Sequence, residues 1–112
     1  MPESFERGAL TEAVYYILLS LHHPRHGYGI MQNIEKLTDG RVNLGPGTLY
    51  GALNALSQKR WIKELYSGGE SRKKEYVITE TGLAVFKAEI QRLSELLRNG
   101  LNADDIIDLR CN

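Results

Sequence analysis

Residues 45–61 read Gly-Pro-Gly-Thr-Leu-Tyr-Gly-Ala-Leu-Asn-Ala-Leu-Ser-Gln-Lys-Arg-Trp, and this stretch decides the fold. Pro46 suits the first position of a helix, because a proline there loses no hydrogen bond that the helix would otherwise make. Leu49, Leu53 and Leu56 follow at helical spacing and form one apolar stripe. The stretch therefore predicts an amphipathic helix whose leucine face is buried.

The opposite face of this predicted helix carries small and polar side chains. It offers hydroxyls, an amide and little bulk through Thr48, Tyr50, Gly51, Asn54 and Ala55. Such a face can approach a DNA groove closely and contact phosphates and base edges. We expect Asn54 to contact bases, and Thr48 and Tyr50 to contact phosphates or bases near the helix start, where the helix dipole favours phosphate.

Two candidate strands, 61–66 and 73–78, follow the helix and are joined by a polar turn at 67–71. The cations at the end of this turn are Arg72, Lys73 and Lys74. Alone, a leucine stripe is often only core, and a basic hairpin is usually a solvated loop. Next to each other they favour a helix that reads DNA and a wing that grips phosphates.

The charge distribution agrees with this interpretation. The 112 residues include 14 Lys or Arg and 14 Asp or Glu, and zero net charge is unusual for a nucleic-acid-binding domain. Residues 41–80, however, carry seven basic and four acidic residues, whereas residues 1–40 carry three and five, and residues 81–112 carry four and five. The positive surplus coincides with the predicted helix and wing.

Other signals limit the class of protein. The first residues lack a secretory signal pattern, and no apolar stretch is long enough to span a bilayer. Cys111 is the single cysteine, so an internal disulfide is impossible. These features predict a cytoplasmic protein with no membrane partner. No catalytic set can be assembled from the motifs, so we expect neither an enzyme nor a cofactor.

Two alternatives stay open at this point. A metal sensor is suggested by His22, His23 and His26, with Cys111 as a fourth ligand. Their spacing lacks the pairing of structural zinc sites, so surface histidines are the simpler explanation and we expect no metal. A winged-helix module that binds another protein would use the same surface, and it would bind DNA weakly and with little salt dependence.

Further elements flank the central helix. Residues 8–22 have apolar side chains at helical spacing, and residues 27–38 form a second helix that Asp39 closes. Residues 41–44 alternate polar with apolar and predict a short strand that adds to the hairpin. A helix capped by Thr79 is predicted over 79–99, ending at Gly100, and a short terminal helix begins near Asn102.

The predicted last helix carries apolar residues three, four, three and four positions apart, which is a heptad seam. The first helix also has more apolar surface than one small domain can bury. The seam could pack on the first helix of the same chain, and we expect it to do so within a dimer. The expected dimer interface comprises Leu10, Val14, Ile17, Leu83, Phe86, Ile90, Leu93 and Leu97.

The predicted architecture is mainly α with a small β-hairpin wing. A winged helix-turn-helix occupies residues 1–78, and a dimerisation helix and short terminal helix occupy residues 79–112, packed with the first part as one domain. The length fits one domain that gains stability from self-association.

The chain resembles the PadR-type transcriptional regulators. The resemblance is carried by His-Gly-Tyr-Gly-Ile at 26–30, Gly-Thr-Leu-Tyr at 47–50, Trp-Ile at 61–62, Arg-Lys-Lys-Glu-Tyr at 72–76 and Ile-Thr-Glu-Thr-Gly at 78–82. With one long helix after the wing, the chain is similar to the short branch of that family. The resemblance implies a homodimeric winged helix-turn-helix protein, usually a repressor, whose third helix enters the major groove.

The resemblance also implies partners and site residues. The expected DNA contacts are Gly47, Thr48, Tyr50, Asn54, Arg72, Lys73 and Lys74. The expected DNA partner is a double-stranded inverted repeat, with half-sites about one turn, roughly 34 Å, apart. Some relatives bind aromatic or cationic compounds between their subunits, and by position Tyr16, Ser20, Leu93 and Leu97 would face that space. Leu93 replaces the large ring of the drug-binding members.

Overall fold

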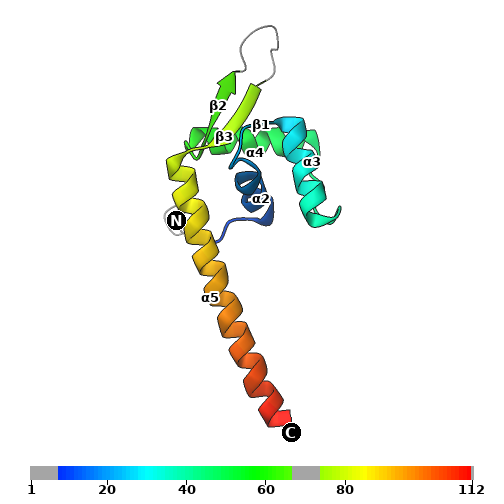
Figure 1. Ribbon diagram of the computed structural model, residues 1–112, viewed down its shortest axis with the longest axis vertical. Helices are drawn as coiled ribbons and strands as arrows, with labels where there is room; N and C mark the ends of the chain where they lie inside the picture. Colours follow the sequence, from blue (N-terminus) through cyan, green and yellow to red (C-terminus); the bar gives the residue numbers. More distant parts are fainter. Residues whose placement is uncertain (1–7, 67–73, 112) are drawn as a thin grey trace.

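The computed structural model describes residues 8–66 and 74–111, with side chains described through residue 103. Three helices and a small sheet gather into one body, and the last helix extends far beyond it (Figure 1), so the molecule measures 67 × 32 × 21 Å. In chain order the elements are α2 (Glu12–Ser20), β1 (Arg25–His26), α3 (Gly27–Thr38), α4 (Pro46–Gln58), β2 (Ile62–Tyr66), β3 (Lys74–Ile78) and α5 (Glu80–Cys111).

The core lies where α2, α3, α4 and the sheet meet. Leu49, Leu53 and Leu56 of α4 are buried, as their spacing predicts. Burying an apolar side chain of this size contributes about 1.5–3 kcal/mol, so the inward face anchors α4 firmly. The buried apolar side chains are Ile17, Leu18, Leu21, Ile30, Ile34, Leu49, Leu53, Leu56, Trp61, Ile62, Tyr76 and Phe86.

The sheet is antiparallel in the order β1-β3-β2, with Arg25 opposite Tyr76 and Ile62 opposite Ile78. The strand predicted at 41–44 is wrong. There the Thr38 hydroxyl accepts a hydrogen bond from the Val42 N–H at 3.0 Å, which folds the chain back on the end of α3. The third strand is β1 instead, which is two residues long.

Two helix boundaries depend on threonine caps. The hydroxyl of Thr11 accepts the N–H of Val14 at 3.2 Å, so α2 starts after Thr11 rather than at the predicted residue 8. The predicted Thr79 cap is confirmed, because its hydroxyl accepts the N–H of Gly82 at 3.1 Å. At the end of α3, Asp39 has φ 54°, which closes the helix as predicted.

The end of α5 differs from the prediction. Gly100 does not stop the helix, and the separate terminal helix expected from residue 102 is its continuation to Cys111. A glycine inside a helix costs only about 1 kcal/mol relative to alanine, which is too little to end this helix.

The predicted seam of α5 divides into two halves. Phe86 is buried in the chain's own core, where its ring stacks on Tyr15 with centroids 4.9 Å apart. Ile90, Leu93 and Leu97 are 40%, 38% and 64% exposed. Ile17 and Phe86 were expected at the dimer interface, but both are buried within the single chain, because their faces of α2 and α5 point inward.

None of the described helices is long and apolar enough to cross a membrane.

Candidate nucleic-acid interface

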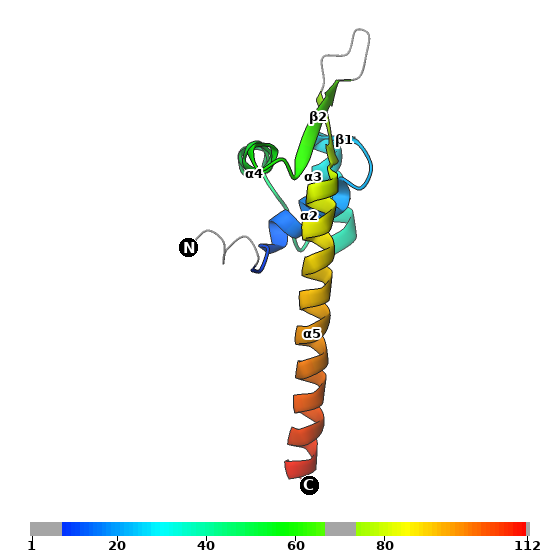
Figure 2. The ribbon, with the colours of Figure 1, turned by 90° about the vertical axis from the view of Figure 1, so that its left-hand side faces the viewer.

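The outer face of α4 brings four predicted contact residues together. Gly47, Thr48, Tyr50 and Asn54 are all exposed, opposite the buried leucines. Helix α4 lies at one side of the body, seen end-on in Figure 2, with the wing strands β2 and β3 rising beyond it. The first N–H groups of an α-helix have no partner within the helix, so the start of α4 favours an anion.

The wing contributes Lys74 to this side of the molecule. Its ammonium lies 3.5 Å from the Glu64 carboxylate, and both side chains are partly exposed. The charge of Glu64 is the main cause that raises the pKa of Lys74, so the lysine is cationic at neutral pH. Two further predicted contacts, Arg72 and Lys73, and the turn at 67–71 lie outside the described residues.

A hollow of about 580 Å³ opens where α3 begins, between α4 and β3. The sequence predicts no role for Tyr28 or Gln32 here, and the His-Gly-Tyr-Gly motif at 26–29 is the signal that could have pointed to Tyr28. A Cβ at Gly27 would lie 2.7 Å from Cζ of Tyr50, so a larger residue there would displace the Tyr50 ring. The lining residues are His26, Gly27, Tyr28, Gly29, Gln32, Tyr50, Lys74 and Tyr76.

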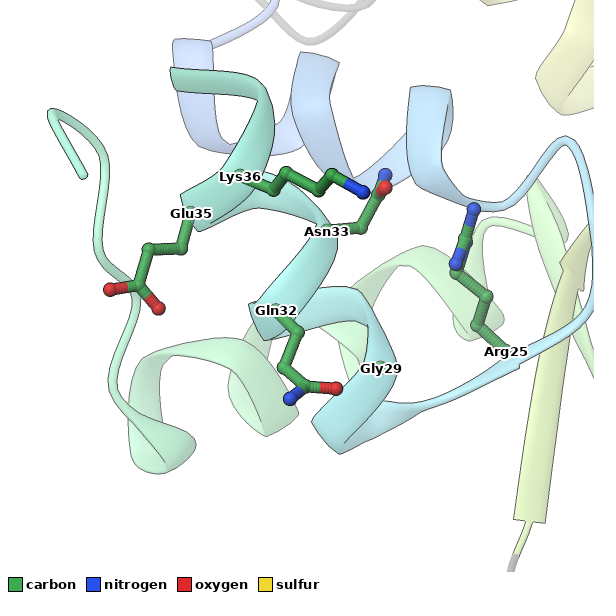
Figure 3. Close-up of a pocket in the computed structure, with 6 residues that line it drawn as sticks. All are labelled: Arg25, Gly29, Gln32, Asn33, Glu35 and Lys36. Carbon is green, nitrogen blue, oxygen red and sulfur yellow. The ribbon is translucent and has the colours of Figure 1, made fainter. Parts of the chain in front are cut away.

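A second, polar hollow of about 490 Å³ lies along α3 (Figure 3). The Arg25 Nε donates to the Ser20 carbonyl at 2.7 Å, and the Asn33 amide donates to the Ser20 hydroxyl at 2.9 Å. These bonds connect β1 and α3 to the end of α2. Figure 3 shows Arg25 and Asn33 pointing the same way, while Gln32 points toward the opposite side.

The residues expected to face an effector are only partly brought together. A hollow of about 300 Å³ lies between α2 and α5, and Tyr16 and Leu93 line it. Leu97 and Ser20 are not among its lining residues. Ser20 is instead 2% exposed and bonded to Asn33, because it lies on the face of α2 that packs against α3. The lining is Leu10, Glu12, Tyr15, Tyr16, Glu89 and Leu93.

Two carboxylates of this hollow are paired. Glu89 is 4% exposed and accepts hydrogen bonds from Arg92 at 2.7 and 2.8 Å and from the Leu10 N–H at 3.2 Å. The Arg92 hydrogen bonds are the main cause that lowers the pKa of Glu89, against the opposing effect of burial. The sequence offered only a weak signal for this buried acid, an arginine three residues after it.

Glu12 connects the hollow to the loop before α4. Its carboxylate accepts from both terminal nitrogens of Arg41, one of them at 3.3 Å. This hydrogen bonding is the main cause that lowers the pKa of Glu12. It is also the main cause that raises the pKa of Arg41, with a smaller contribution from Tyr16. Arg41 stands four residues before Gly45, the N-cap of α4. A hollow at α2 is thereby linked to the start of α4.

Two of the three histidines considered as metal ligands, His22 and His26, have other partners. A ring nitrogen of His22 lies 3.1 Å from the Leu18 carbonyl, and the His22 ring meets Phe86 edge-on. A ring nitrogen of His26 lies 3.0 Å from the Lys74 carbonyl. Within the described residues, no group of three or more His, Cys, Asp or Glu side chains could hold a metal.

Comparison with known proteins identifies the family. The model of the PadR-like family of transcriptional regulators matches residues 16–88, from within α2 to the first half of α5. The chain belongs to this family. Its members are transcriptional regulators rather than enzymes, and this PadR-like chain places the exposed face of α4 and the wing within the matched segment.

Two relatives match by sequence. The PadR-like chain is 33% identical over 107 residues to an uncharacterized protein of Lysinibacillus sphaericus, covering 92% of this chain and 88% of that protein. It is 36% identical over 73 residues to a 37.1 kDa protein in a Streptomyces fradiae transposon, covering 65% of this chain. The match spans only 20% of the length of the Streptomyces fradiae protein.

Solved structures share the fold. A PadR family regulator from Eggerthella lenta is 25% identical with a TM-score of 0.65, covering 92% of this chain and 87% of that chain. A PadR family regulator from Clostridium difficile is 25% identical with a TM-score of 0.67, covering 81% and 95%. A transcriptional regulator from Clostridium thermocellum is 24% identical with a TM-score of 0.68, covering 92% and 97%. The predicted mainly helical fold with a winged helix is confirmed.

Proposed function

We propose that this PadR-like chain is a homodimeric, sequence-specific DNA-binding repressor that releases its operator when a small effector binds. The observation that carries the proposal is the division of α4 into two faces. Leu49, Leu53 and Leu56 hold the helix in the core, and the opposite face is polar and exposed. A helix held in this way can enter the major groove without losing its own packing.

The roles along this face follow from side-chain chemistry. The amide of Asn54, in the middle of α4, can pair with an adenine edge through two hydrogen bonds. Thr48 and Tyr50 lie near the start of α4, where hydroxyls and free N–H groups suit a phosphate. Lys74 adds a salt-dependent phosphate contact from the wing.

Dimerisation is supported by the part of α5 from Ile90 onward, the exposed half of its seam. Helix α5 extends beyond the body of the molecule (Figure 1). Large apolar side chains stay exposed along this part of the helix, which is typical of a surface that binds another helix. A two-fold dimer would present two α4 helices to one face of DNA, so the operator should be an inverted repeat. The exposed side chains are Ile90, Leu93, Leu96, Leu97 and Leu101.

The hollow between α2 and α5 is the proposed effector site. A partner helix on the exposed half of α5 would help to cover it, and its tyrosines and carboxylates suit an aromatic or cationic compound. A ligand that engages Glu12 competes with Arg41, which precedes α4. Such a ligand would shift the start of α4 in proportion to its preference for one arrangement over the other.

Selection from a pool of random DNA duplexes tests the DNA-binding function. The full chain is expected to enrich one motif with two-fold symmetry. Recovery of duplexes without a common motif would contradict the proposal and favour the protein-interaction alternative.

Thermal-shift screening with aromatic cations tests the effector site. A compound that stabilises the parent should lose most of its effect on Tyr16→Ala, because Tyr16 lines the hollow. Tyr66→Ala, which alters an exposed wing tyrosine, should respond as the parent does. Equal shifts in Tyr16→Ala and Tyr66→Ala would remove Tyr16 from the site.

A further inference from the structure

The hollow at the start of α3 joins three elements beside the proposed DNA-reading face. Tyr28 and Gln32 come from α3, Tyr50 from α4 and Lys74 from β3. Tyr28 is 67% exposed and Tyr50 is 48% exposed, so the hollow is open to solvent on the side that α4 presents. Because Tyr50 belongs both to the hollow and to the outer face of α4, a group bound in the hollow would lie next to that face.

The lining suits an anion. Tyr28 and Tyr50 supply hydroxyls, Gln32 an amide and Lys74 an ammonium, all of which donate hydrogen bonds. Among the described residues, no carboxylate lines the hollow. Two acids lie next to it and pair with lining residues, Glu64 with Lys74 at 3.5 Å and Glu75 with the His26 ring at 3.6 Å. A phosphate in the hollow would therefore share Lys74 with Glu64.

The inner wall of the hollow is fixed by packing. The Tyr50 ring rests against Gly27, where a Cβ would lie 2.7 Å from Cζ of the tyrosine. The His26 ring contacts the Lys74 carbonyl, which connects the start of α3 to β3. The donors therefore sit on elements that are connected to each other, so little ordering is needed when an anion binds.

We propose that this hollow binds one phosphate of the DNA backbone next to the groove that α4 enters, through Tyr28, Gln32 and Lys74. The assignment of the ligand to DNA rests on the proposed function. Phosphate contacts fix the orientation of a protein on DNA but carry no sequence information. The site therefore sets affinity for every duplex and leaves the choice of sequence to Asn54 and its neighbours on α4.

The test compares two substitutions of the same chemistry. Gln32→Glu places a negative charge in the hollow, and Gln91→Glu places one on the exposed surface of α5. In the first measurement, isotope-labelled full chain is titrated with inorganic phosphate and followed by NMR. Saturable shifts of the Tyr28 and Gly29 amides and the Gln32 side chain are expected in the parent and in Gln91→Glu, with the Tyr28 and Gly29 shifts lost in Gln32→Glu. Absence of these shifts in the parent, or their persistence in Gln32→Glu, would overturn the site.

The second measurement gives the affinity of the same variants for the selected duplex and for a scrambled one. Gln32→Glu should weaken binding of both duplexes by roughly tenfold, since the amide contact is lost and the new carboxylate repels the phosphate. Gln91→Glu should weaken neither. If Gln32→Glu weakened binding of the selected duplex alone, Gln32 would contact a base, and the phosphate assignment would be overturned. If phosphate produces the expected NMR shifts but the parent binds the selected and scrambled duplexes equally, the anion site stands and sequence-specific reading is contradicted. Failure of the anion site can therefore be distinguished from failure of the proposed function.

Discussion

Gly82 determines how closely the long helix can approach the sheet. A Cβ at this position would overlap the Trp61 carbonyl oxygen and lie 2.9 Å from Cγ1 of Ile78. The Trp61 carbonyl also accepts the N–H of Thr79 at 3.0 Å, so it cannot move without breaking the junction between β3 and α5. The Thr-x-x-Gly spacing at 79–82 combines a cap with a close contact.

We therefore expect Gly82→Ala to lower the free energy of unfolding by about 1–3 kcal/mol, because an added methyl group overpacks the junction. Chemical denaturation measures the change. Gly100→Ala is the control, since a Cβ there meets nothing within 4 Å and alanine should stabilise α5 by up to about 1 kcal/mol. A Gly82→Ala protein as stable as the parent would contradict the described contact.

Glu89 gives the regulator a pH-dependent contribution to stability. Its pKa is lowered in the folded chain, chiefly by the Arg92 hydrogen bonds, so the folded state binds the proton less readily than the unfolded state. The stabilisation is therefore complete above the unfolded pKa and is lost as the pH falls through the lower folded pKa.

Glu89→Gln should lower the free energy of unfolding by about 1–3 kcal/mol at neutral pH, because charge-assisted bonds to a buried group are lost. The difference from the parent should shrink as the pH falls below about 4. Urea titrations at several pH values measure it. A difference that stays constant down to acidic pH would show that ionisation of Glu89 does not contribute.

At the scale of elements, long periodic patterns predicted well. The stripe of α4 spans several turns, so only one helical face could be buried. The spacing in α3 predicts Ile30, Ile34 and Leu37 on its inner face; the first two are buried, but Leu37, one residue before the last of the helix, is 51% exposed. The strand predicted at 41–44 rested on four residues, and hydrogen bonds around Thr38 outweigh such a short alternation. β1 could not be foreseen, because its two residues become a strand only by pairing with β3.

The site residues also divide into those whose placement depends on their own helix and those whose placement depends on packing between elements. The exposure of Thr48, Tyr50 and Asn54 could be predicted, since it depends only on the period of their own helix. The hollows could not, because each joins residues from different elements. Tyr28 meets Tyr50 and Lys74 only through packing between α3, α4 and β3, and Ser20 faces α3 because of contacts that its own helix does not specify.

The exposed half of α5 is expected to hold the dimer together. Leu97→Arg should shift the protein toward monomer, because it places a charge in an apolar helix contact. Leu37→Arg is the matched control on the body, where the leucine is 51% exposed against 64% for Leu97. Sedimentation analysis distinguishes the two. Unchanged association of Leu97→Arg would contradict the proposed interface.

At the scale of the whole molecule, we propose that the body reads DNA and that α5 joins two such bodies in a dimer. The body fixes α4 by its buried leucines, and α5 reaches well beyond the body to the surface proposed for the partner (Figure 1). In the proposed dimer, the spacing of the two α4 helices would set the spacing of the half-sites, and a ligand in the hollow between α2 and α5 would alter that spacing.

The most direct measurement is the affinity of the parent, Asn54→Ala and Asn99→Ala for the selected duplex and a scrambled duplex across a range of salt concentrations. The affinity of the parent for the selected duplex should exceed its affinity for the scrambled duplex by a factor of about 10³ or more. Asn54→Ala should reduce that preference by a factor of roughly 5–150, the equivalent of about 1–3 kcal/mol, and Asn99→Ala on α5 should leave it unchanged. Equal affinity of the parent for both duplexes, or a preference that Asn54→Ala leaves intact, would contradict reading by the outer face of α4.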